Sequence, residues 1–353
     1  FSNDLYFSRH GVDEANKPSL ITRYRQFFRR HHTELQFKST YASTKIFTKD
    51  YGYEGRNYNL AANYAFLTFY GLGKLRYHTK EQDWHQELRQ RKQALGEEAQ
   101  QAKTVLYTWD EPHHNFIGGI PAFKQWLNQI TPFIQSFNKK SQDDMLVYAT
   151  TWRNDIGADS ALNAYAAKTE QEYKAMQQEG VEHWQINHIG TLQDYVAVSR
   201  FAGWQAFAKA VDVWWAWEST HVPTGFNIYK DSKNFLNQYG EYGVGDGLLI
   251  YPGTDKLNPN TSPELSGPIG GLRFYNWRQG FIDYEYLHLA AQQDPHAVKN
   301  IIKQLIHPKN PSMQLPNNLG YAKYPINNNA YQKARAQLVD IILSNKANLL
   351  VNH

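Results

Sequence analysis

Two acidic residues stand side by side at Asp110 and Glu111, inside the sequence Tyr-Thr-Trp-Asp-Glu-Pro. The segment before them, 104–110, has the apolar and β-branched composition of a strand. Pro112 ends that strand, because proline has no amide hydrogen for a strand ladder. Neighbouring side chains in a regular strand point to opposite faces. The two carboxyl groups therefore converge on one substrate only if the strand stops here, and Pro112 provides the stop.

A carboxyl pair of this kind can divide acid and base work between its members. One group with a raised pKa donates a proton while the other stays ionised, an arrangement that sugar hydrolysis commonly uses. The alternative is a strand end followed by an acid that caps a helix, since Asp-Glu-Pro is a common tripeptide. Because the pair is predicted to lie at a strand end, we give the catalytic interpretation and the helix-capping interpretation equal weight.

Short β-rich segments alternate with amphipathic helices up to about residue 218, which predicts a parallel sheet. Eight strands are expected, at 5–12, 34–41, 64–71, 104–110, 145–152, 160–166, 182–189 and 211–218. Helices are expected between them, at 20–31, 82–101, 120–137, 169–178 and 199–208. This pattern predicts an α/β fold, a (β/α)8 TIM barrel, with its active site at the carboxyl ends of the strands.

A long loop rich in Gly, Pro, Asn and Asp, 219–271, follows the eighth expected strand and contains one short expected strand at 247–251. A helix over 272–291 closes the barrel, and two further helical segments follow from residue 294. We therefore expect a catalytic barrel over 1–293 and a C-terminal helical extension over 294–353 packed on its outside.

Composition narrows the classes of partner. The 353 residues include 37 Lys and Arg against 33 Asp and Glu, a net charge of +4, without a basic run that could follow a nucleic-acid backbone. No apolar run approaches the ~18 residues of a membrane helix. The absence of cysteine excludes thiolate nucleophiles and zinc–sulfur sites. The 10 Trp, 24 Tyr and 18 Phe favour a carbohydrate partner, because aromatic rings stack on the C–H faces of sugars.

Four blocks of the sequence resemble the catalytic barrel of glycoside hydrolase family 123, in order and in spacing. They are Tyr-Thr-Trp-Asp-Glu-Pro at 107–112, Arg200-Phe-Ala-Gly-Trp with Val-Asp-Val-Trp-Trp-Ala-Trp at 211–217, Gly-Asp-Gly-Leu-Leu-Ile-Tyr-Pro-Gly at 245–253, and Gly-Leu-Arg-Phe-Tyr-Asn-Trp-Arg-Gln-Gly-Phe-Ile-Asp-Tyr-Glu-Tyr-Leu at 271–287. The first hundred residues fit only as generic barrel units, and we expect no counterpart among them of the β-sandwich that usually precedes this barrel. Ile282 stands where the family has an acid.

The resemblance implies a retaining β-N-acetylgalactosaminidase-type glycosidase that uses no cofactor. In that mechanism the substrate's own 2-acetamido oxygen attacks the anomeric carbon and forms an oxazoline. Glu111 would protonate the leaving oxygen and then activate water. Asp110 would orient the acetamido group. The resemblance also leads us to expect an exported protein, periplasmic, cell-surface or extracellular, acting on an oligo- or polysaccharide; no oligomeric state follows from the sequence.

Other strand ends supply candidates for the sugar pocket. We expect them to be Trp152, Tyr165, Asn187, His188, Trp215, Trp217 and Glu218. Tyr165 can donate its hydroxyl to the acetamido oxygen, although it and the tryptophans are equally credible as barrel filling. The end of the seventh expected strand offers Asn187 and His188 rather than a carboxylate, which favours substrate assistance over an enzyme nucleophile.

Two further hypotheses stay open. Glu218 can serve as the nucleophile of a conventional retaining glycosidase, or the chain can be a barrel that binds glycans without cutting them. A metal site is not expected, because His113, His114, His188 and His221 lack the paired spacing of metal ligands.

Overall fold

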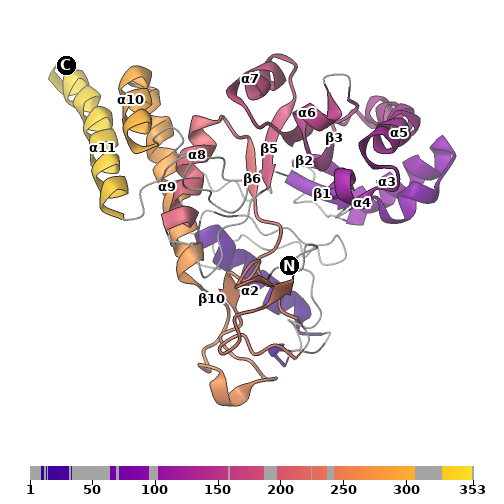
Figure 1. Cartoon of the computed structure of the whole chain (residues 1–353), viewed down its shortest axis with the longest axis horizontal. Helices are drawn as coiled ribbons and strands as arrows, with labels where there is room; N and C mark the ends of the chain where they lie inside the picture. Colours follow the sequence, from indigo (N-terminus) through magenta and orange to yellow (C-terminus); the bar gives the residue numbers. More distant parts are fainter. Residues whose placement is uncertain are drawn as a thin grey trace. The chain divides into compact units, whose positions relative to one another are not determined.

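The computed structural model describes residues 9–11, 13, 15–31, 33, 64–68, 71–94, 102–157, 160–186, 197–223, 225–236, 242–306 and 328–351 (Figure 1). The chain divides into two compact units. The first unit comprises Phe1–Ser2, Asp13–Arg30 and Glu34–Ile186. The second unit comprises Asn3–Val12, His31–Thr33 and Asn187–His353.

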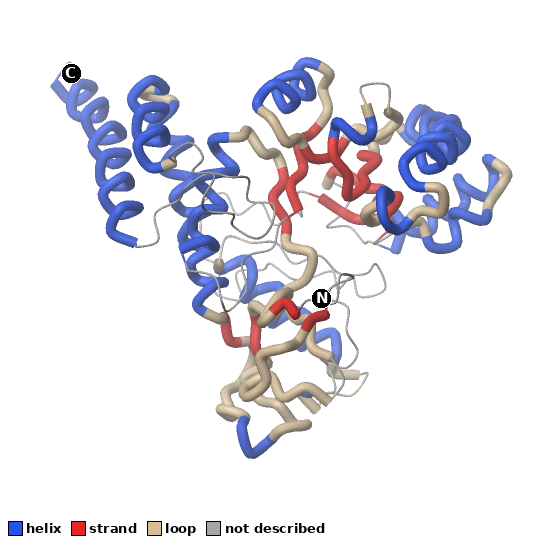
Figure 2. The backbone as a smooth tube through the Cα atoms, viewed as in Figure 1, coloured by secondary structure: helices blue, strands red, loops and turns tan. Residues whose placement is uncertain are grey.

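The first unit is built on parallel strands (Figure 2), which follow one another in the sheet in chain order. These strands are β1 (Tyr64–Thr68), β2 (Lys103–Trp109), β3 (Leu146–Trp152), β4 (Ala164–Ala166) and β5 (Glu182–Ile186). The helices of the unit are α2 (Lys17–Arg30), η3 (Gly73–Tyr77), α3 (Glu81–Ala94), α4 (Pro112–Asn115), α5 (Gly119–Ser141), α6 (Arg153–Ile156) and α7 (Glu170–Gln178). Helices between successive strands are what a parallel sheet requires.

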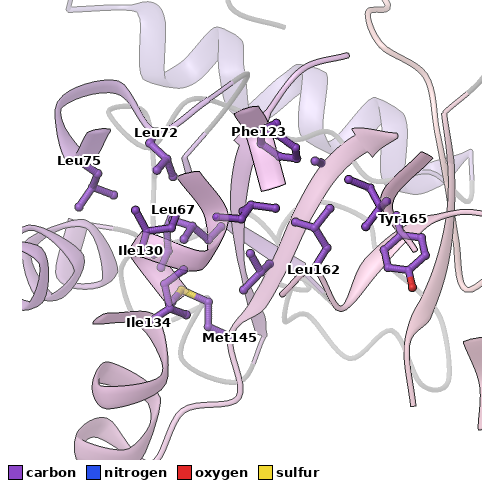
Figure 3. Close-up of a cluster of buried hydrophobic side chains, with 14 of the residues drawn as sticks. Leu67, Leu72, Leu75, Phe123, Ile130, Ile134, Met145, Leu162 and Tyr165 are labelled. Carbon is purple, nitrogen blue, oxygen red and sulfur yellow. The ribbon is translucent and has the colours of Figure 1, made fainter. Parts of the chain in front are cut away.

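One face of this sheet packs into a hydrophobic core with the helices (Figure 3). Leu67, Leu106 and Val147 come from three neighbouring strands, and Ile130 and Ile134 come from α5. The buried residues of α5 recur at intervals of three or four, so that one stripe of the helix faces the sheet. Burial of these side chains is the main stabilising contribution to the unit.

The other face carries what we call the aromatic layer, made of Tyr64, Phe66, Tyr107, Tyr148 and Trp184. Those on β1, β2 and β3 alternate along their strands with members of the hydrophobic core, and so lie on the opposite face, and Trp184 on β5 packs against their rings. The ring centroids of Tyr107 and Tyr148 are 4.8 Å apart, and those of Tyr148 and Trp184 are 4.7 Å apart. The layer places the Tyr107 hydroxyl among buried rings just before the Asp-Glu-Pro sequence.

The expected closed (β/α)8 TIM barrel is wrong. The sheet is open and curled, with six strands in the order β1-β2-β3-β4-β5-β6, and β6 is Val213–Trp215. The expected strand at 5–12 is wrong where it is described, because Arg9 is helical and the next two residues form a turn. The expected strand at 34–41 lies outside the described residues. Alternation along a chain predicts parallel pairing, but closure depends on a pairing between the first and last strands that local sequence does not encode.

The remaining six expected strands are confirmed as β1 to β6, although the structure makes several of them shorter. The strand expected over 160–166 is reduced to β4, Ala164–Ala166. The last residues of the strand expected over 182–189 lie outside the described residues.

The second unit is mainly helical. Its helices are α8 (Ala197–Ala208), η5 (Pro259–Thr261), α9 (Leu272–Ala291), α10 (Pro295–Leu305) and α11 (Asn328–Val351). Besides β6, short strands form two antiparallel pairs, β7 (Phe235–Leu236) with β8 (Tyr242–Gly243) and β9 (Ile250–Tyr251) with β10 (Ile269–Gly270). The helix expected over 272–291 is confirmed as α9. Among the helices that the structure describes, none has both the length and the apolarity to cross a membrane.

Two glycines bring α8 and α9 into backbone contact. A Cβ atom added to Gly203 would lie 1.9 Å from the carbonyl oxygen of Gly280, and one added to Gly280 would lie 2.2 Å from that of Arg200. Any side chain at either position must therefore push the helices apart. Both glycines belong to the sequence blocks described above. The presence of glycine at these two positions is therefore explained by the packing of α8 against α9.

A buried carboxylate ties three helices of the second unit together. Asp283 on α9 is fully buried and accepts hydrogen bonds from Arg200 Nε at 2.8 Å and from Trp204 Nε1 at 2.9 Å, both on α8. Arg335 on α11 donates to the other carboxylate oxygen through Nε at 2.5 Å. Two cations and an indole thus satisfy one buried anion, which meets the requirement that a buried charge be paired.

A second buried ion pair holds the long loop expected at 219–271. Arg9 and Asp255 are both inaccessible to solvent and are joined by a 2.7 Å bond from Arg9 Nη1 to Asp255 Oδ2. Arg9 Nη2 also donates to the carbonyl oxygen of Phe226 at 2.6 Å. Arg9 therefore binds two residues of the loop, Phe226 and Asp255, that are far apart in the sequence.

Lys209 directly follows α8, and burial of its side chain lowers the pKa of its ammonium group to about 8. The unfolded chain keeps a pKa near 10.5 and so binds more protons than the folded chain between about pH 8 and pH 10.5. Folding stability that depends on this group therefore rises with pH across that window, and the cost of burying the charge is fully present below it.

Replacing Asp283 by alanine is expected to lower the free energy of unfolding by about 3–5 kcal/mol, because Arg200 and Arg335 lose their buried anion. Urea denaturation followed by circular dichroism measures this loss. The matched control is Glu285→Ala, an exposed carboxylate on the same helix, with a change within about 0.5 kcal/mol. A loss under 1 kcal/mol for Asp283→Ala would show that the network does not support the fold.

Replacing Lys209 by methionine is expected to raise the free energy of unfolding at pH 7 by about 1–3 kcal/mol, because a half-buried ammonium group that is partly desolvated is removed. The advantage of the variant should shrink as the pH rises from 8 to 10.5, where the wild-type lysine becomes neutral. If the free energies of unfolding of the two proteins changed by the same amount across this pH range, the lowered pKa of Lys209 would be contradicted.

Candidate active site

Strand β2 ends at Trp109, and the two acids follow immediately. Glu111 adopts φ 43° and ψ 62°, in the left-handed region that residues other than glycine seldom occupy. The register between β2 and β3 also shifts between Tyr107 and Trp109. The regular alternation of side chains is therefore interrupted at Glu111, which releases the pair from pointing to opposite faces.

The short helix α4 holds this bend in place. The carbonyl oxygen of Glu111 accepts hydrogen bonds from the backbone amides of His114 at 2.9 Å and Asn115 at 2.8 Å. The Asn115 side chain donates to the carbonyl oxygen of Asp110 at 3.2 Å. Pro112 is buried at the first helical position, where its missing amide hydrogen costs nothing. The proline thus begins the helix as well as ending the strand.

The carboxylate of Asp110 is held by a tyrosine on its own strand. Tyr107 Oη donates to Asp110 Oδ1 at 2.7 Å, and the same phenol oxygen contacts the hydroxyl of Thr150 on β3. Burial, the neighbouring Tyr148 and the charge of Asp110 raise the pKa of Tyr107 well above its usual value. The phenol therefore keeps its proton and serves as a donor to the carboxylate.

His113 lies two residues beyond Glu111 and is half-buried. Burial lowers the pKa of its imidazole, and the adjacent His114, whose ring centroid is 4.1 Å away, lowers it further. Asp155 and Asp110 oppose this shift without reversing it. A neutral imidazole thus stands close to the acid pair. In the part of the chain that the structure describes, no group of three His, Cys, Asp or Glu side chains is arranged to hold a metal ion.

Two of the expected sugar-pocket residues lie on neighbouring strands of the same unit. Trp152 is the last residue of β3 and is half-buried, with the ammonium of Lys168 5.1 Å from its ring centroid. Tyr165 on β4 is 1% exposed and packs in the hydrophobic core, and its hydroxyl accepts a hydrogen bond from Arg153 at 3.1 Å. Tyr165 therefore packs as a residue that fills the interior of the fold, whereas Trp152 is partly exposed at the end of its strand.

Trp217 is held by the Gly-Asp-Gly block of the second unit. Its indole Nε1 donates to Asp246 Oδ1 at 3.2 Å, and its ring centroid lies 5.1 Å from that of His221. Gly247 has φ +66°, and a Cβ atom there would lie 2.5 Å from Trp217 Cζ2. Only glycine allows this close approach. The block therefore fixes the orientation of one indole ring.

Glu218 is bound to its own turn. Its Oε1 accepts hydrogen bonds from the backbone amides of Ser219 at 2.8 Å and Thr220 at 3.2 Å, and from the Thr220 hydroxyl at 3.3 Å. Arg273 on α9 is buried and donates to the carbonyl oxygens of Gly245 and Leu248. This carboxylate thus has a structural task of its own.

The nine expected site residues are distributed over both units. Asp110, Glu111, Trp152 and Tyr165 belong to the first unit, where the first three stand at the carboxyl ends of the adjacent strands β2 and β3. Trp215, Trp217 and Glu218 belong to the second unit, with Trp215 half-buried at the end of β6. Asn187 and His188 lie outside the described residues.

Sequence reasoning missed Tyr107 and Thr150. The available signal was hydroxyl side chains on largely apolar strands, within a few residues of a strand end that carries polar groups. Buried hydroxyls need partners, so such residues point to a polar group beside them.

The comparisons with known proteins find little. No protein-family model and no curated protein sequence matches the chain. The structure weakly resembles a solved structure of a family 123 glycoside hydrolase from Clostridium perfringens, described in connection with glycolipid glycan hydrolysis. The TM-score is 0.47 at 12% identity, over 77% of this chain and 46% of the other, so this chain spans about half the length of that protein. Membership of family 123 stays a prediction.

Proposed function

We propose that this chain is a retaining glycoside hydrolase that cleaves β-linked 2-acetamido sugars of the GalNAc type with assistance from the substrate. One observation carries the proposal: Asp110 and Glu111 follow each other where β2 ends, and the left-handed backbone of Glu111 breaks the strand geometry just before α4. The resemblance of the sequence blocks to family 123 supplies the substrate class.

Adjacency of the two acids suits this chemistry. The 2-acetamido group of the sugar is attached to the carbon next to the anomeric carbon, so the groups that act on these two positions must also be neighbours. A conventional retaining enzyme instead needs two carboxyl groups ~5–5.5 Å apart on opposite sides of the anomeric centre. Residues next to each other on one strand end fit the first requirement better.

In the first step Glu111 donates its proton to the glycosidic oxygen as the bond from that oxygen to C1 breaks. The carbonyl oxygen of the acetamido group forms a bond to C1 from the other face and closes an oxazolinium ring. The carboxylate of Asp110, hydrogen-bonded to Tyr107, accepts a hydrogen bond from the N–H of the acetamido group and stabilises the positive charge that develops on that nitrogen.

In the second step Glu111, now a carboxylate, takes a proton from water. The water oxygen bonds to C1, and the bond from C1 to the acetamido oxygen breaks. Two displacements at C1 retain the β configuration, and Glu111 is protonated again for the next cycle. Glu218 needs no part in this cycle, which agrees with its hydrogen bonds to Ser219 and Thr220. Trp152, at the end of the adjacent strand β3, is proposed as a surface for the sugar ring.

Glu111→Gln is expected to lower kcat/KM on unactivated GalNAc glycans about 10³-fold, because the proton donor is lost. With an aryl glycoside whose leaving group needs no protonation, azide should restore turnover of this variant and yield the β-glycosyl azide. Asp110→Asn is expected to lose about 10²–10³-fold on both substrates and to gain nothing from azide. Colorimetric assays and mass spectrometry of the products measure these effects.

The matched control is Asp155→Asn, a nearby carboxylate on α6, with activity close to that of the wild type. Near wild-type turnover in Glu111→Gln or Asp110→Asn would refute the assignment. Covalent labelling of Glu218 by a 2-fluoro sugar would instead establish the conventional mechanism, and binding of glycans without any release of reducing ends would establish the non-catalytic alternative.

The backbone at Glu111 allows a test of strain. Glu111→Gly is expected to raise the free energy of unfolding by about 0.5–1 kcal/mol, because glycine adopts the left-handed conformation without steric cost. Gln142→Gly is the matched control, since Gln142 has φ 53° at the end of α5, far along the chain from the acids. Both variants should gain stability in urea denaturation, and only Glu111→Gly should lose activity. A loss of stability confined to Glu111→Gly would contradict strain at this residue.

A further inference from the structure

We infer that Tyr107 and Thr150 are positioning residues that fix which carboxylate oxygen of Asp110 faces the acetamido group of the substrate. The inference rests on the proposed function, and it adds two residues that the sequence blocks alone do not assign. It follows from the hydrogen bonds and burial of three side chains on two adjacent strands.

The hydrogen bonds run in one direction. Tyr107 on β2 has a single hydroxyl hydrogen, which it donates to Asp110 Oδ1 at 2.7 Å. The phenol oxygen is then left as the acceptor in its contact with Thr150 Oγ1 on β3, so the threonine hydroxyl donates to it. Such a chain of donors polarises its last member and strengthens the bond to the carboxylate.

The surroundings prevent both hydroxyls from turning away. Tyr107 is inaccessible to solvent and Thr150 is 9% exposed, so water does not compete for these hydrogen bonds. The ring of Tyr107 packs against Tyr148 and Phe66, at centroid distances of 4.8 Å and 6.5 Å. Thr150 lies on β3, which pairs with β2 in a parallel register. The donor therefore stands on a strand that is paired with β3, whereas the acceptor lies just beyond the last residue of that strand.

This arrangement leaves one side of the Asp110 carboxylate for substrate. Among the described residues, Tyr107 is the donor to this carboxylate, and its hydrogen bond goes to Oδ1. Asn115 binds the backbone oxygen of Asp110 and leaves the side chain alone. The second oxygen, Oδ2, can then accept the N–H of the acetamido group, with its direction set by the bond at Oδ1. Without that bond the carboxylate rotates, and its contact with the oxazoline nitrogen loses direction.

The inference is tested by measuring how tightly the GalNAc-derived thiazoline, a stable analogue of the oxazoline, binds to Tyr107→Phe. Titration calorimetry should show about 10- to 100-fold weaker binding, the usual effect of losing a hydrogen bond to a charged group. Thr150→Val should weaken binding less than tenfold, and Thr150→Ser, which keeps the hydroxyl, should restore it. KM for an aryl GalNAc glycoside should change less than kcat.

A double variant separates positioning from damage to the fold. In an Asp110→Ala background Tyr107→Phe should change thiazoline affinity less than twofold, because the group that Tyr107 positions is gone. Thr108→Val is the control for loss of a buried hydroxyl on β2, since Thr108 Oγ1 donates to the Tyr148 carbonyl oxygen at 2.8 Å on the other face of the sheet. It should keep the affinity of the wild type.

The outcomes distinguish the inference from the function on which it rests. Wild-type affinity in Tyr107→Phe, or the same loss with and without Asp110, overturns the inference and leaves the proposed function standing. A wild-type protein that neither hydrolyses 2-acetamido glycosides nor binds the thiazoline overturns both.

Discussion

The candidate site depends on one backbone constraint, the left-handed conformation of Glu111 directly after a buried parallel strand. A strand places successive side chains on opposite faces, so two adjacent acids cannot serve one substrate while the strand continues. The buried Pro112 and the amides of α4 hold the break. Strain at this point is the kind that proteins retain at functional sites, where surrounding structure compensates for it.

Buried polar groups organise both units, but they do so in different ways. In the first unit, the Thr150 and Tyr107 hydroxyls satisfy each other and Asp110 within a layer of aromatic rings. In the second unit, full charges are paired: Asp283 with Arg200 and Arg335, and Arg9 with Asp255. Isolated charges at these depths would cost several kcal/mol each, so every member of such a network depends on its partners. The packing of α8, α9 and α11 therefore depends on the carboxylate of Asp283, and the position of the long loop depends on that of Asp255.

Local sequence predicted the elements well where their patterns are strong. The helix over 272–291 has its expected bounds, and the strand that precedes Asp110 lies where its apolar run predicts. The closed barrel was wrong because alternation of strands and helices establishes parallel pairing only between neighbours along the chain. Closure is a relation between strands far apart in sequence, and no local period reports it.

The sequence by itself determined that two acidic residues stand side by side at a strand end, that no thiol takes part, and where most of the parallel strands lie. Only the tertiary structure decided that Tyr107 and Thr150 support Asp110 and that Glu218 binds its own turn. It also decided that the glycines of two sequence blocks serve helix contact, at Gly203 and Gly280. The reason is physical: periodicity and turn chemistry act over a few residues, whereas hydrogen bonds and close packing join groups that the fold brings together.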